Sequence, residues 1–105
     1  MARKNFEEVW TFIMGLEGKE VRTLERRFKN EIRKVTRDAV YVFSERSISG
    51  DVSKVSRSQF EDIWYELVKT GQCSEVRARY VAYAIIAKLP EVTYGGRPVT
   101  LYLAD

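Results

Sequence analysis

The first hydrophobic pattern in the chain has the period of an α-helix. One helical stripe between residues 6 and 16 is apolar, and its members are Phe6, Val9, Trp10, Ile13 and Leu16. Asn5 and Glu8 have the spacing of a capping box, and Gly18 supplies a stop signal after the stripe. The pattern predicts a helix from residue 5 to about residue 16.

After residue 18 the pattern changes to short runs rich in β-branched residues. The runs at residues 31–35 and 39–43 predict two strands, and residues 36–38 between them suit a hairpin turn. A third short strand is predicted over residues 52–56, after a serine-rich loop. Alternation along the second strand places Tyr41 and Phe43 on the face opposite Val40 and Val42.

The clearest helical pattern covers residues 59–70, with Ser58 and Glu61 spaced as a capping box and Gly71 as the stop. A short turn at residues 71–73 leads to a helix from Ser74 to about Leu89, which a proline ends. Residues expected to face the core on these two helices are Phe60, Ile63, Trp64, Leu67, Val68, Val76, Tyr80, Val81, Ala84, Ile85 and Leu89.

The last predicted element is a β-hairpin over residues 91–103, with Gly95-Gly96 in its turn. The order is an N-terminal helix, two or three antiparallel strands, a helix-turn-helix and a C-terminal hairpin. This order predicts an α+β fold of winged-helix-like type. A chain of 105 residues suits a single domain, residues 1–105.

Composition excludes several kinds of chemistry. The chain has no histidine and one cysteine, Cys73, which excludes Cys/His zinc sites and His-dependent nucleophilic catalysis within this chain. Glu17 and Lys19 match only the shorter half of a metal-dependent nuclease motif. We therefore expect no enzymatic activity, no metal and no cofactor. The longest uncharged apolar stretch is eight residues, so we expect no membrane span and a soluble, cytoplasmic protein.

Charge is distributed unevenly along the chain. The net charge is +3, yet residues 19–57 alone carry eleven Lys or Arg against six acids. A basic middle segment of this kind favours contacts to phosphates. The alternative is a solvated strand surface on which Lys and Arg block edge pairing.

These features predict a non-catalytic domain that binds nucleic acid, with double-stranded DNA favoured over RNA. Phosphates would be contacted by the basic strands and loop, and bases by the last helix and the hairpin. An exposed aromatic residue such as Tyr41 or Phe43, beside Arg46, would suit a stacked base. The candidate binding residues are Arg33, Lys34, Arg37, Arg46, Lys54, Arg57, Arg77, Arg79 and Arg97.

Residues 55–67 and 79–90 resemble small domains appended to prokaryotic restriction endonucleases and related DNA-processing proteins. In these domains a motif of the form Gly-x-x-x-x-Thr-Leu precedes two strands, and Gly18, Thr23 and Leu24 match it. The resemblance covers about residues 16–103 and implies a part that reads or targets DNA. This chain departs from the family pattern at Arg79, where members often carry Ser or Asn.

A second class of function stays open at this point. The basic strands could instead face an acidic protein, as in an accessory or inhibitor protein of phage or mobile-element type. The partner would then be another protein, or a second copy of this chain, in place of nucleic acid.

Overall fold

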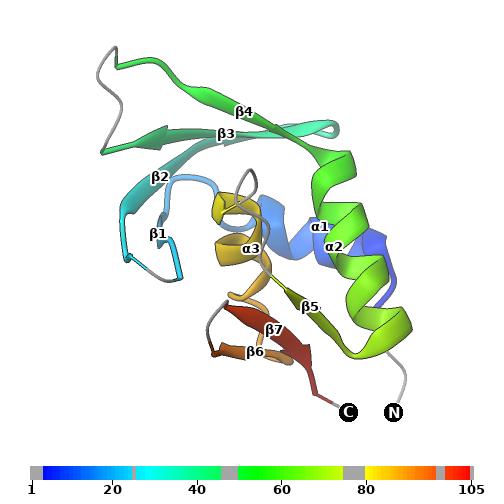
Figure 1. The fold of residues 1–105 in the computed structure, drawn as a ribbon. Coiled ribbons are helices and arrows are strands. Elements are labelled where there is room, and N and C mark those ends of the chain that lie inside the picture. Colours follow the sequence, from blue (N-terminus) through cyan, green and yellow to red (C-terminus); the bar gives the residue numbers. More distant parts are fainter. Residues whose placement is uncertain (1–3, 25, 46–49, 75–79, 97–98, 105) are drawn as a thin grey trace.

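The computed structural model describes residues 4–24, 26–45, 50–74, 80–96 and 99–104 (Figure 1). These residues form an α+β fold, as predicted, and their strands make two antiparallel sheets of four and three strands. The elements are α1 (Phe6–Met14), β1 (Glu20–Arg22), β2 (Lys29–Val35), β3 (Ala39–Ser44), β4 (Ser53–Ser56), α2 (Arg57–Thr70), β5 (Gln72–Ser74), α3 (Tyr80–Ile86), β6 (Val92–Gly95) and β7 (Thr100–Leu103). None of the helices in the described residues is long and apolar enough to cross a membrane.

The helices lie between the two sheets, which have the strand orders β1-β2-β3-β4 and β5-β7-β6 (Figure 1). Apolar side chains from all three helices and both sheets form one core. Trp10 and Trp64 are buried in it, as predicted from their positions on the helical stripes. Their indole N–H groups donate to the carbonyls of Thr36 and Lys4, so neither indole is left unsatisfied.

The predicted strands at residues 31–35, 39–43 and 52–56 correspond to β2, β3 and β4. The structure adds a fourth strand, β1, which pairs with β2 and was not predicted. Gly18 has a φ of +85° and its N–H donates to the Ile32 carbonyl at 2.7 Å. Gly18 therefore directs the chain into β1 and does not end α1, because α1 ends four residues earlier at Met14.

The start of α1 is confirmed and the predicted start of α2 is wrong. Asn5 and Glu8 form the expected capping box. The helix α2 begins at Arg57 directly after β4, and its N-cap, Ser56, makes no side-chain capping bond. The N–H of Arg57 instead donates to the carbonyl of Asp38 in the β2–β3 turn, at 2.8 Å. The sheet therefore sets the first turn of α2, and the predicted Ser58–Glu61 box does not form.

The predicted turn at residues 71–73 is also wrong, because Gln72–Ser74 forms β5 and pairs with β7. The helix α3 ends at Ile86, three residues before the predicted end, and residues 75–79 of the predicted helix lie outside the described residues. Tyr80 was expected in the core but is 39% exposed, whereas Tyr83 is 2% exposed and packs inside. Val68 on α2 is likewise exposed, at 39%. The predicted C-terminal hairpin is present as β6 and β7.

Candidate nucleic-acid interface

The four-stranded sheet has one buried face and one face directed to solvent. Val40 and Val42 are 0% and 2% exposed and pack against the helices. Tyr41 and Phe43 alternate with them, point to the opposite face and are half-buried. The predicted alternation in this strand is therefore confirmed. We call the solvent-directed face the outer sheet face, formed by Glu20, Arg22, Lys29, Glu31, Arg33, Lys34, Tyr41, Phe43 and Lys54.

A row of three side chains crosses the middle of the outer sheet face. Tyr41 on β3 is paired with Lys34 on β2 and with Lys54 on β4. Directly paired residues of antiparallel strands share a face and lie side by side, so a lysine flanks the phenol ring on each side. Both lysines are exposed, and neither makes an ion pair with any of the described residues. The row combines an aromatic ring with two free positive charges.

A β-bulge at Arg33 creates this row. Ile32 pairs with Val42 and Lys34 pairs with Tyr41, so Arg33 is an extra residue in β2. With regular pairing, Lys34 would oppose Val40 and face the core. The bulge keeps Ile32 buried and moves Lys34 to the outer sheet face.

The ring of Phe43 contacts an arginine side chain. Its cross-strand neighbour is Glu31, and the Arg33 guanidinium lies 4.7 Å from its ring centroid. Arg33 also forms an ion pair with Glu31. Arg33 is thus held by a carboxylate and a ring face, and it partly covers Phe43.

Charge on the outer sheet face is neutralised at one end and free at the other. At the β1 end, Glu20 pairs with Arg22 at 3.2 Å and with Lys29 at 3.7 Å. Nearer the β2–β3 turn, Lys34 on β2 and Lys54 on β4 have no carboxylate partner in the described part of the chain. The surplus of positive charge is therefore concentrated around Tyr41.

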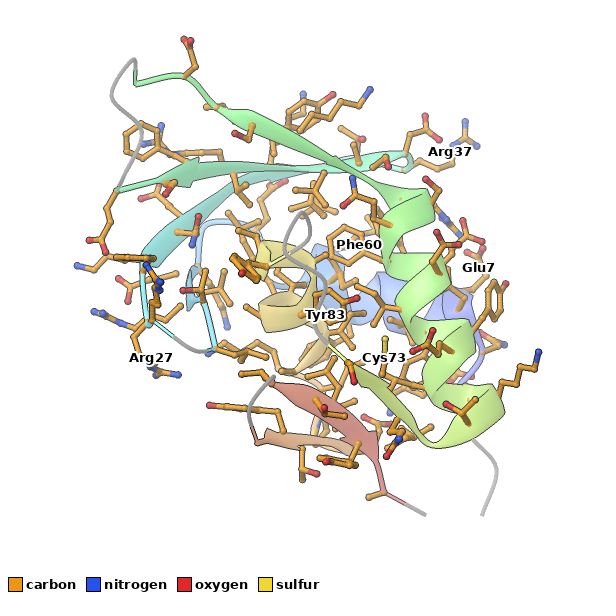
Figure 2. The ribbon with its side chains drawn as sticks, in the orientation of Figure 1. Glu7, Arg27, Arg37, Phe60, Cys73 and Tyr83 are labelled. Atoms are coloured by element: carbon orange, nitrogen blue, oxygen red, sulfur yellow. The ribbon has the colours of Figure 1, made fainter. Side chains whose placement is uncertain are left out.

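Arg37 extends this charge past the sheet. It is exposed in the β2–β3 turn, at the end of the sheet where α2 begins (Figure 2). Its side chain has no ion-pair partner among the residues that the structure describes. Arg37 is therefore a third free cation next to the row.

Arg57 has a different environment from the other predicted cations. Its side chain is 20% exposed and pairs with Glu7 on α1 and with Glu61 at 3.6 Å on α2. Its guanidinium also lies 5.1 Å from the Phe6 ring and 5.2 Å from the Trp10 ring. These contacts join α1 to α2, so Arg57 is occupied in holding the two helices together.

The remaining predicted cations are Arg46, Arg77, Arg79 and Arg97, and all four lie outside the described residues. Arg22 and Lys29 were not predicted as members of the face. Arg22 could have been found only by placing β1 next to β2, which three residues of strand do not reveal. Lys29 lies on β2 two residues before Glu31, so it was missed because the predicted strand began at residue 31.

The described residues contain no group of three His, Cys, Asp or Glu side chains that could hold a metal ion. The one sequence match to a nuclease motif has a structural explanation. Glu17 accepts a hydrogen bond from the Val35 N–H at 2.7 Å, so its carboxylate secures the end of β2.

No family model, curated protein or solved structure matches the chain. The resemblance to domains of restriction endonucleases therefore stays a prediction from the sequence. The geometry and charge of the outer sheet face are the features that bear on function.

Proposed function

We propose that the protein is a nucleic-acid-binding domain without chemistry of its own, and that double-stranded DNA is its ligand. The observation that carries the proposal is the row Lys34–Tyr41–Lys54 on the outer sheet face. Its two lysines are free of carboxylate partners among the described residues, so they need not break an ion pair to contact phosphate.

The size of the row suits a phosphate backbone. Neighbouring strands lie about 4.8 Å apart, so the two lysines are separated by about 10 Å at the backbone. Phosphates follow one another at regular intervals along a DNA strand, so two lysines at this separation can contact different phosphates of one strand. Arg37, which is exposed in the β2–β3 turn, offers a further cation to the same backbone.

Tyr41 favours a second candidate ligand, single-stranded nucleic acid. An aromatic ring between two cations on a sheet face can stack on an unpaired base while the cations contact the backbone. A duplex offers no unpaired base, so in a duplex complex the ring would contribute little. The role of Tyr41 therefore distinguishes the two ligands.

The proposal is tested by fluorescence anisotropy, which measures the affinity for one labelled duplex and for its separate single strand at two salt concentrations. We expect the variant K34Q/K54Q to bind more weakly and with less salt dependence than the unaltered protein. The matched control is K69Q, which removes an exposed positive charge from the last turn of α2, away from the four-stranded sheet. K69Q should bind with nearly the same affinity and the same salt dependence as the unaltered protein.

The variant Y41L then separates the two ligands. If duplex DNA is bound, Y41L should change the affinity little. If a single strand is bound, the loss of stacking should cost about 1–3 kcal/mol. The proposal fails if neither nucleic acid binds at low salt, and stoichiometric capture of an acidic protein would then support the accessory-protein alternative.

A further inference from the structure

A cavity lies at the β1 edge of the four-stranded sheet, between β1, the β1–β2 turn, the end of α3 and β6, and it shares only Glu20 and Arg22 with the outer sheet face. Its volume is about 340 Å³. Among the residues that the structure describes, its charged lining consists of Arg22, Arg27 and Lys88, with Glu20 as the single acid, and Tyr94 forms part of its wall. The cavity thus brings cations from three parts of the chain to one place.

Arg27 is held in this position by a tightly bonded turn. Its φ of +61° lies in the left-handed region, which residues other than glycine seldom adopt. The turn is closed by the Arg27 N–H donating to the Thr23 carbonyl at 3.0 Å, and by the Phe28 N–H donating to Thr23 Oγ1 at 2.9 Å. Asn30, which is buried, also donates its side-chain amide to the Phe28 carbonyl. Thr23, singled out in the sequence as part of the Gly-x-x-x-x-Thr-Leu motif, therefore fixes the backbone of Arg27.

The positive charge in the cavity is only partly neutralised. Glu20 pairs with Arg22, and with Lys29 outside the cavity. Arg27 and Lys88 have no carboxylate partner among the residues that the structure describes. Two free cations therefore line one polar cavity.

Tyr94 completes the wall opposite the sheet. Its hydroxyl accepts a long hydrogen bond, 3.4 Å, from Arg27 Nη1, and 45% of the residue is exposed. This weak contact leaves the other donors of the Arg27 guanidinium available to a ligand. The exposed ring offers a surface on which a planar group can stack.

From these observations we infer that the cavity binds a phosphate monoester. A phosphate monoester carries a charge of about −1.5 to −2 at neutral pH, which matches the two free cations. A guanidinium donates to phosphate through two parallel N–H groups, and a lysine adds a point charge. The inference goes beyond the proposed function, because Arg27, Lys88 and Tyr94 do not belong to the outer sheet face.

Two kinds of ligand carry a phosphate monoester: a nucleic acid strand with a terminal phosphate, and a free nucleotide. Calorimetry at constant ionic strength with adenosine monophosphate tests the free nucleotide, and adenosine serves as its uncharged control. Anisotropy with a short oligonucleotide carrying either a 5′-phosphate or a 5′-hydroxyl tests the strand end. Preferential binding in either arm supports the site and identifies the source.

We expect R27N and K88Q each to weaken binding of the phosphate-bearing probe about ten-fold or more, as expected for a lost charged hydrogen bond. Asn tolerates a positive φ, so R27N removes the guanidinium without adding backbone strain. The control R26Q removes the same charge from the same turn but outside the cavity, and it should bind normally. Should R27N fail to fold by circular dichroism, K88Q carries the test, because Lys88 is exposed.

The variant K34Q/K54Q should bind adenosine monophosphate normally, which separates this site from the proposed sheet interface. The inference is overturned if adenosine monophosphate does not bind and the two oligonucleotides bind equally. It is also overturned if R26Q weakens binding as much as R27N and K88Q do.

Discussion

Replacing Arg57 should destabilise the protein without changing how it binds nucleic acid. Arg57 lies at the first turn of α2, and its guanidinium reaches carboxylates on both α1 and α2. Methionine has a similar helix propensity and retains an unbranched apolar side chain, so R57M removes chiefly the charged group.

The contacts of the Arg57 guanidinium give the size of the expected loss of stability in R57M. The guanidinium faces two aromatic rings, Phe6 and Trp10, each worth about 0.5–1 kcal/mol. The ion pairs with Glu7 and Glu61 add only about 0.3–0.5 kcal/mol each, because the Glu7 side chain is 79% exposed. A loss of about 2 kcal/mol follows, which lowers the Tm of a domain of this size by about 10 °C.

Thermal unfolding followed by circular dichroism measures this loss. R37M is the matched control, since it removes the same group from an exposed turn residue and should change stability by less than about 0.5 kcal/mol. The salt dependence of DNA binding by R57M, measured below its Tm, should equal that of the unaltered protein. An unchanged Tm together with a salt slope smaller by about one would show instead that Arg57 contacts phosphate.

Three further predictions concern stability. N5A should cost about 1 kcal/mol in urea unfolding, because the capping box with Glu8 is lost. G71A should cost about 1 kcal/mol or more in the same assay, because a Cβ there meets no neighbour but φ is +83°. Burial of Glu91 opposes its ionisation, but the hydrogen bond from Lys4 and the Lys4 charge outweigh burial and hold its pKa below 4.5. Stability from this pair should be present above pH 4.5 and fall as the pH drops through the lowered pKa, and K4M should weaken this acid dependence.

The sequence allowed the periodic elements to be predicted, because their own residues determine them. The stripe of α1, its capping box and the β2–β3 hairpin follow from local pattern and turn chemistry. The strand β5 could not be found in this way, because three residues have no measurable period and Gln72–Ser74 is a strand only through pairing with β7. The start of α2 was misplaced for a similar reason, since a bond to the β2–β3 turn sets it.

Only part of the candidate site could be predicted from the sequence. Alternation showed that Tyr41 and Phe43 share a face. The lysines beside Tyr41 depend on cross-strand register, and the bulge at Arg33 shifts that register by one residue. The sequence held a trace of the bulge, because Ile32 and Val35 both face inward at a spacing that a regular strand would place on opposite faces.

The proposed function depends on contacts between the phosphate backbone and the side chains of Lys34 and Lys54. The most direct test is the slope of log K against log salt for duplex binding, measured for the unaltered protein and for K34Q/K54Q. Each phosphate contact contributes about 0.9 to the slope, so the double variant should have a slope smaller by about 1.8. A slope that is the same in both proteins, or no binding by the unaltered protein at low salt, would show that these two lysines do not contact phosphate.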